Sequence, residues 1–113
     1  MKGLVPDQIR EFQAALFRAL GHPTRLTVVE ILATEGEKCV CELVQRLGFD
    51  QSTVSKHLTV LKSAGIVKSR KRGLNVFYYL NVKCAYQFMK CVEQLLRDGR
   101  QIECTPQWVE VAD

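Results

Sequence analysis

Residues 39–65 read CVCELVQRLGFDQSTVSKHLTVLKSAG, and this stretch decides the fold. Apolar residues recur at helical spacing on both sides of a short break at Gly48-Phe49-Asp50. They are Leu43, Val44 and Leu47 before the break, and Val54, Leu58 and Leu61 after it. The stretch therefore predicts two short helices, over about 39–47 and 51–64, joined by a three-residue turn that contains glycine. Such a pair is typical of a helix-turn-helix.

The residues on either side of this pair complete one small domain. Two earlier helices begin near Pro6 and Pro23, because proline is favoured in the first turn of a helix. After Gly65 the apolar period changes from 3.6 to 2, which predicts a strand over 74–80, a partner strand over 66–70 and a turn at 71–73. A last helix follows over about 82–98. We expect a mainly α, α+β fold with the element order α-α-α-α-β-β-α over residues 1–98, followed by an irregular tail over 99–113.

The last predicted helix carries two apolar stripes. Val82, Ala85, Met89, Val92 and Leu96 form one, and Cys84, Phe88, Cys91 and Leu95 form the other. A helix that is apolar over so wide an arc must be covered on two sides. Its own domain can cover one side, and a second copy of the chain best explains the other. The stripes therefore predict a homodimer.

The basic residues are concentrated in one part of the chain. The formal net charge is +4, yet residues 51–80 hold Lys56, Lys62, Lys68, Arg70, Lys71 and Arg72 and no acidic residue. Such a block is expected where a protein binds a polyanion. This basic block covers the second helix of the helix-turn-helix and the hairpin that follows it. A hairpin in that position is the expected wing of a winged helix. These features together predict binding to double-stranded DNA.

The dimensions of the major groove allow one helix to enter it and place the first residues of that helix on the base edges. Hairpin cations suit phosphates or the minor groove. The predicted DNA contacts are Gln51, Ser52, Thr53, Ser55, Lys56 and His57 on the helix, and Lys68, Arg70, Lys71 and Arg72 on the hairpin.

Other classes of protein are disfavoured. No secretory signal or membrane-length apolar run is present, so we expect a cytoplasmic protein. The sequence has no Cys-x-x-Cys, no phosphate-binding glycine loop and no obvious carboxylate pair, which argues against an enzyme. Five cysteines are an odd number, and a reducing compartment favours free thiols over a disulfide framework. We expect Cys84 and Cys91, which share an apolar stripe, to pack in the core.

Four motifs in order resemble the ArsR/SmtB family of metalloregulatory repressors. They are LGHPTRL at 20–26, CVCEL at 39–43, QSTVSKHL at 51–58 and LKSAGIV at 61–67. The resemblance covers about residues 10–98. It implies a dimeric winged helix, paired through its first and last helices, that represses transcription and releases DNA when an inducer binds.

Cys39-Val40-Cys41 is the sharpest chemical feature. Two thiolates at this spacing can chelate a soft ion. The same spacing also suits two small apolar residues that pack at the start of a helix. The family resemblance favours ligands and an As(III) or Sb(III) inducer, with Cd(II), Pb(II), Zn(II) or thiol oxidation as the alternative. In an ideal helix, residues two apart point about 200° away from each other, so we expect the first turn to unwind when one ion binds both.

The family's arsenic pattern has a third cysteine, where this chain has Val44. We expect Cys104 or an external thiol to supply the third thiolate. The zinc-type site of the family, on the last helix, is expected to be absent, because Asn81 and Lys83 stand near its start.

Overall fold

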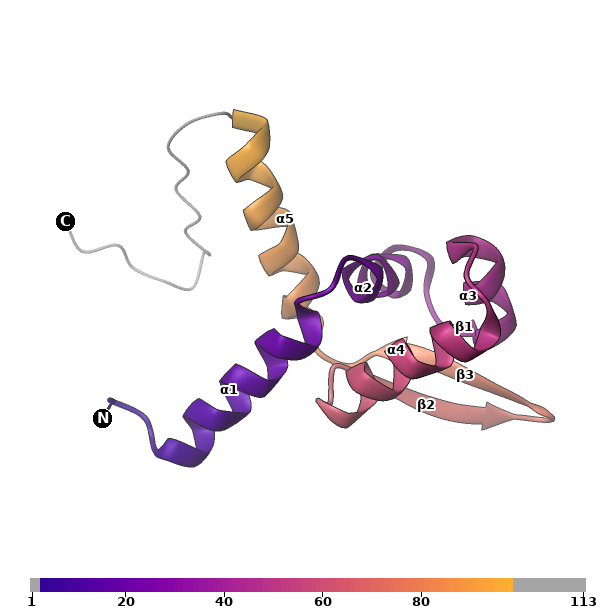
Figure 1. Cartoon of the computed structure of the whole chain (residues 1–113), viewed down its shortest axis with the longest axis horizontal. Coiled ribbons are helices and arrows are strands. Elements are labelled where there is room, and N and C mark those ends of the chain that lie inside the picture. The colour runs from indigo at the N-terminus through magenta and orange to yellow at the C-terminus, as the bar shows by residue number, and fades with distance from the viewer. Residues whose placement is uncertain (1–2, 99–113) are drawn as a thin grey trace.

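A computed structural model of the chain describes residues 3–98, which contain five helices and one three-stranded sheet (Figure 1). The tail predicted from residue 99, including Cys104, lies outside these residues. The elements are α1 (Asp7–Leu20), α2 (Pro23–Glu35), β1 (Lys38–Cys39), α3 (Val40–Leu47), α4 (Gln51–Ser63), β2 (Val67–Arg72), β3 (Asn75–Leu80) and α5 (Cys84–Asp98).

The core lies where α2, α3 and α4 pack on the sheet. The three apolar residues predicted to face inward from α4, Val54, Leu58 and Leu61, are fully buried. Leu43 of α3 is also fully buried, and Val28 and Val29 of α2 meet them. The apolar periodicity of residues 39–65 is therefore confirmed as the inward face of the helix-turn-helix.

The sheet differs from the predicted hairpin in two respects. A short first strand, β1, pairs antiparallel with β3, so the strand order is β1-β3-β2. β1 has only two residues, too few to show an alternating pattern. The second difference is the turn, which is Gly73-Leu74, because Arg72 still pairs with Asn75. Gly73 adopts a φ of 60°, which suits glycine, and Leu74 is exposed at the tip rather than part of a strand.

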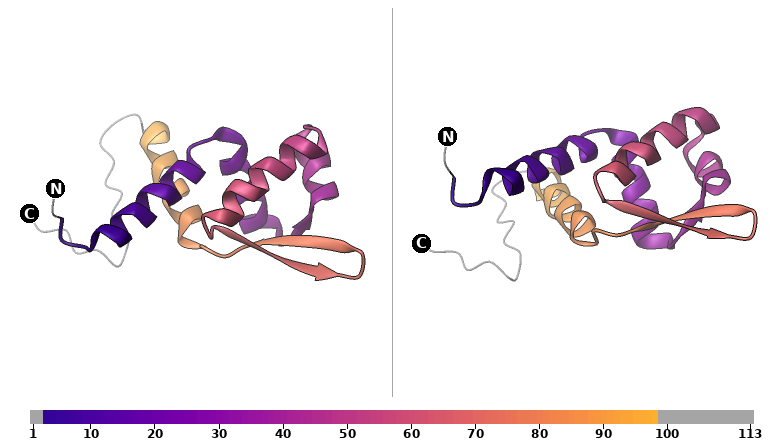
Figure 2. Two further views of the ribbon diagram at one scale, coloured as in Figure 1. Left: turned by 60° about the horizontal axis from the view of Figure 1, so that its bottom comes forward. Right: turned by 90° about the horizontal axis from the view of Figure 1, so that it is seen from below.

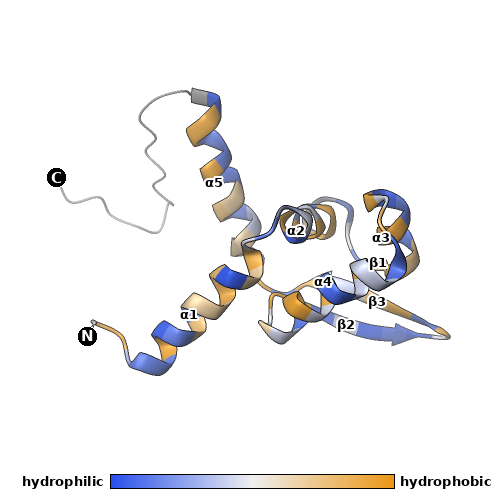
Figure 3. Ribbon diagram, in the orientation of Figure 1, coloured by the Kyte–Doolittle hydropathy of each residue, from blue (hydrophilic) through white to orange (hydrophobic). Residues whose placement is uncertain are grey.

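Helices α1 and α5 extend away from the body formed by the other elements, as the two turned views also show (Figure 2). Only the start of α5 packs on that body, where Ala85 is buried. Several large apolar side chains of both helices stay exposed, and the hydropathy colouring of the ribbon in Figure 3 shows hydrophobic segments along α1 and α5. The exposed side chains are Ile9, Phe12 and Phe17 on α1, and Phe88, Val92, Leu95 and Leu96 on α5.

Among the described residues, no helix combines the length and the apolar character that a membrane crossing requires.

Candidate functional site

Helix α4 presents a polar face to solvent. Its first turn is capped by Asp50, whose Oδ1 accepts a hydrogen bond from the Thr53 backbone N–H at 3.2 Å. Hydrogen bonds from Thr53 hold the pKa of the Asp50 carboxyl below its usual range. Gln51, Ser52 and Lys56 are exposed, whereas Thr53 and Ser55 are half-buried. The cap therefore fixes the start of a helix whose opposite face is anchored in the core.

His57 lies apart from this polar face. Its ring packs on His22, with 4.5 Å between the ring centroids, and Arg25 Nη1 donates to His57 Nδ1 at 3.3 Å. Arg25 also donates from Nε to the carbonyl oxygen of Ala19 at 2.6 Å. His57 thus joins α4 to the corner between α1 and α2. This packing indicates a structural role beside the predicted contact with DNA.

The surroundings of His57 predict a pH dependence of stability. Burial, then the charges of His22 and Arg25, hold the pKa of His57 below its usual value of 6.5. The unfolded chain then binds a proton at higher pH than the folded chain, so stability falls as the pH drops below about 6.5. We expect the His57→Gln variant to lose part of this fall. Urea unfolding of both proteins at about pH 7.5 and about pH 5.5 measures it. An equal fall in both would contradict the prediction.

The wing places its basic residues on two faces of the sheet. Lys62 Nζ of α4 donates to Ser69 Oγ at 2.8 Å, so the face of β2 that carries Ser69 and Lys71 lies toward α4. Lys68, Arg70 and Arg72 alternate with them and belong to the other face. The four basic residues of β2 are therefore divided between the two faces of the sheet.

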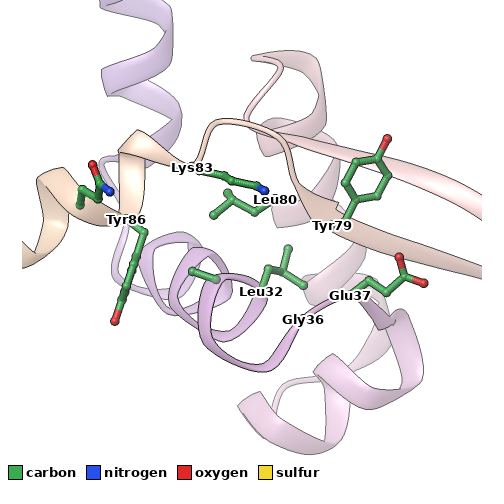
Figure 4. A pocket seen from close by; sticks show the side chains of 9 residues that line it. Leu32, Gly36, Glu37, Tyr79, Leu80, Lys83 and Tyr86 are labelled. Atoms are coloured by element: carbon green, nitrogen blue, oxygen red, sulfur yellow. The ribbon is translucent and has the colours of Figure 1, made fainter.

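An acidic residue that the sequence analysis did not single out contacts the wing. Glu37, just before β1, pairs with Arg70 and Arg72, and it lines a surface pocket beside Tyr79 (Figure 4). Its only signal in the sequence is its place two residues before Cys39, which does not indicate a partner in the hairpin.

Cys39 and Cys41 meet at the start of α3. Cys39 is the N-cap: its backbone is extended, with a ψ of 166°, and its Sγ accepts a hydrogen bond from the Glu42 backbone N–H at 3.4 Å. Glu42 Oε1 in turn accepts from the Cys39 N–H at 3.0 Å. Cys39 is buried and Cys41 is exposed, and a disulfide joins their sulfur atoms.

This geometry corrects two expectations. The premise of the predicted unwinding, that Cys39 lies within the helix, is wrong, because Cys39 is the extended residue before α3 and not part of its first turn. The two sulfur atoms therefore come together while α3 stays intact. The expectation of free thiols is also wrong for this pair. The bridge closes a ring between near neighbours, so it does not tie distant parts of the chain together.

The other cysteines do not complete a metal site among the described residues. Cys84 is exposed and carries a free thiol, so its predicted core position is wrong. Cys91 is half-buried and does not carry a free thiol. Val44, which stands where the family pattern has its third cysteine, is half-buried beside the core. Within residues 3–98, no group of three or more His, Cys, Asp or Glu side chains is arranged to hold a metal ion.

Together, α3, the turn at 48–50, α4 and the β2–β3 hairpin form a winged helix-turn-helix, the architecture of a DNA-binding domain. Residues 22–69 match the model of the family described as bacterial regulatory protein, arsR family. An uncharacterized HTH-type transcriptional regulator from Methanocaldococcus jannaschii is 44% identical, over 75% of this chain and 96% of that protein. The arsenical resistance operon repressor of Escherichia coli is 35% identical, over 73% of this chain and 70% of that protein.

A solved structure supports the fold independently. The homodimeric winged helix-turn-helix DNA-binding domain from Mycobacterium bovis superposes with a TM-score of 0.76 at 24% identity, covering 91% of this chain and 99% of that one. The chain belongs to the arsR family of regulatory proteins. It is a DNA-binding transcriptional repressor of that family and not an enzyme.

Proposed function

We propose that this repressor works as a homodimer in the cytoplasm and leaves its operator when Cys39 and Cys41 bind arsenite or antimonite. The observation that carries the proposal is the convergence of the two sulfur atoms at the N-terminus of α3. In the reduced protein, each thiol would replace one hydroxyl group of arsenous acid and release one water molecule. The Escherichia coli relative, which is named for arsenical resistance, supports this choice of inducer.

The dimer is supported by the unpartnered apolar surface of α1 and α5. Phe17 and Phe88 meet edge to face, with 5.8 Å between their centroids, and both remain more than half exposed in the single chain. Contiguous apolar surface of this kind marks an interaction site. The Mycobacterium bovis domain, described as homodimeric, has the same fold. A two-fold dimer would place two α4 helices in successive major grooves.

DNA recognition is assigned to the exposed face of α4 and to the wing. Gln51 suits an adenine edge, and Lys56 suits guanine or phosphate. Ser52, Thr53 and Ser55 suit bases or phosphates at the start of the helix. Lys68, Arg70, Lys71 and Arg72 of the wing, and His57 if its ring turns outward, suit the phosphate backbone.

The cysteine pair is placed to influence both DNA-binding elements. Cys39 caps α3, and α3 packs directly on α4. Cys39 also pairs with Phe77 of β3, so β1 joins the same residue to the wing. The free energy that couples inducer to DNA must come from a difference in inducer affinity between two conformations. The cap and the strand pairing are the contacts through which such a difference would pass.

Titration with arsenite tests the proposal. The DNA probe is a duplex selected by the reduced wild-type protein from a random-sequence pool. We expect arsenite to release the wild-type protein from this duplex. The Cys39→Ser and Cys41→Ser variants should stay bound to DNA when arsenite is added. Cys84→Ser, which removes an exposed free thiol, is the matched control and should respond like the wild type. Release of the Cys39→Ser variant by arsenite would refute the assignment. A Cys104→Ser variant with weakened arsenite binding would identify the third thiolate.

The disulfide favours a second candidate function, a response to thiol oxidation. A two-electron oxidant such as a peroxide would take two electrons and two protons from Cys39 and Cys41 and leave the S–S bond. DNA release on peroxide addition that dithiothreitol reverses, with no response to arsenite, would favour this function. Release by Cd(II), Pb(II) or Zn(II) instead of arsenite would favour the corresponding metal.

A further inference from the structure

Two arginines of the wing share one carboxylate from outside the wing. Arg72 Nη2 lies 2.8 Å from Glu37 Oε1, and Arg70 Nε lies 3.3 Å from Glu37 Oε2. The Glu37 side chain is only 22% exposed, so these ion pairs are shielded on one side. Each oxygen of Glu37 is therefore ion-paired with a different residue of β2.

Aromatic rings hold the same two guanidinium groups from the sheet. Arg70 lies over Tyr79 with 4.4 Å to the ring centroid, and Arg72 lies over Phe77 with 5.6 Å. Phe77 and Tyr79 belong to the face of β3 that matches Arg70 and Arg72 in the strand register. Each arginine is thus confined by a carboxylate and by a ring, which together restrict the rotamers it can adopt.

The confined arginines keep groups free for DNA. Their side chains are 51% and 59% exposed, and a guanidinium group has five N–H donors. Binding to phosphate normally requires a flexible arginine to be ordered, which reduces affinity. In this wing the ion pairs and the rings would supply part of that ordering before DNA arrives. The arrangement has the character of a preorganised phosphate site rather than of a neutralised surface.

We propose that Glu37 is a positioning residue for DNA binding, which orients Arg70 and Arg72 toward phosphate and links them to the cysteine pair. Glu37 lies directly before β1, the strand that contains Cys39 and pairs with β3 through Lys38 and Tyr78. A change at Cys39 would therefore move the carboxylate that holds the wing. The link to the cysteines, unlike the positioning, rests on the proposed function.

The positioning role of Glu37 is tested by whether the Glu37→Gln variant binds DNA more tightly or more weakly than the wild type. Glu37→Gln removes a negative charge close to the DNA-binding wing, so electrostatics alone would tighten binding. Loss of orientation at two arginines predicts the opposite, a weakening of about five- to tenfold in reduced protein without inducer. Glu37→Asp keeps the charge but shortens the reach, and we expect it to weaken binding by a similar factor. Tighter binding by Glu37→Gln, or wild-type binding by Glu37→Asp, would overturn the proposal.

Glu35→Gln is the matched control for this test. It removes the same charge two residues away, but Glu35 pairs with Arg46 and Lys38 and not with the wing. We expect this variant to bind DNA at least as tightly as the wild type. Circular dichroism of all three variants establishes that the fold is retained. If Glu35→Gln weakened DNA binding as much as Glu37→Gln, the effect would belong to this loop in general. The specific role of Glu37 would then be overturned.

Arsenite distinguishes the link from the proposed function. Loss of reactive thiols reports arsenite binding in each protein, independently of DNA. We expect Glu37→Gln to bind arsenite like the wild type. On addition of arsenite, its DNA affinity should fall by a smaller factor than the DNA affinity of the wild type. An unchanged factor would overturn the link. A wild-type protein that keeps its DNA in arsenite would overturn the proposed function, and the affinities measured without inducer would still decide the role of Glu37.

Discussion

Replacing Phe88 with aspartate is expected to separate the dimer and to weaken binding to a two-half-site DNA duplex by about 10²- to 10⁴-fold. Phe88 is 52% exposed on α5 and meets Phe17 of α1. A carboxylate at this position would be buried without a partner at the interface, which strongly opposes association. Two linked DNA-binding units gain affinity because binding of the first raises the effective concentration of the second, and monomers lose that gain.

Sedimentation equilibrium and DNA titration of the same samples measure the two effects. Gln94→Asp is the control, because it adds the same charge to an exposed position elsewhere on α5. We expect this variant to remain dimeric and to bind DNA close to the wild-type level. A Phe88→Asp protein that is still dimeric would show that α5 does not form the interface.

Replacing Leu58 with alanine is expected to lower the free energy of unfolding by about 3 kcal/mol, within the range measured for buried leucines. Leu58 is fully buried on the inward face of α4, in the core cluster that also contains residues of α2 and of the sheet. The change removes apolar contacts and leaves a cavity that a small domain cannot fill completely. A loss of this size is a large part of the total free energy of unfolding of a small domain. We therefore expect α4 to lose its fixed position for DNA binding as well.

Urea unfolding followed by circular dichroism measures the change, with Val60→Ala as the control. Val60 lies on the same helix but is 39% exposed, so we expect its replacement to change stability by less than about 1 kcal/mol. Equal losses in the two variants would mean that helix propensity, rather than core packing, dominates at position 58.

The local pattern was sufficient to predict most of the fold. Val54, Leu58 and Leu61 were expected to face inward from their spacing alone, and all three are fully buried. Hydrophobic periodicity succeeds here because one buried face of a helix imposes a repeat on its own sequence. The wing was predicted from alternation, but its turn was placed too early, since Lys71 and Arg72 resemble turn residues and still pair within β2.

The cysteine site shows how far spacing can mislead. Residues two apart were expected to diverge, because a regular helix was assumed to include Cys39. The extended conformation at Cys39 comes from its two roles, pairing with β3 and capping α3. Neither role is visible in a two-residue strand without the partner that it pairs with.

The sequence by itself determined the helix-turn-helix, the basic wing and the pair of cysteines, because each is encoded by neighbouring residues and their period. Only the tertiary structure decided that both sulfur atoms meet at an intact helix, that His57 packs on His22 and Arg25, and that Glu37 holds Arg70 and Arg72. These contacts join residues that are distant in the chain. They depend on how strands and helices pack, and no local rule of spacing or composition specifies which charges then lie within reach of one another.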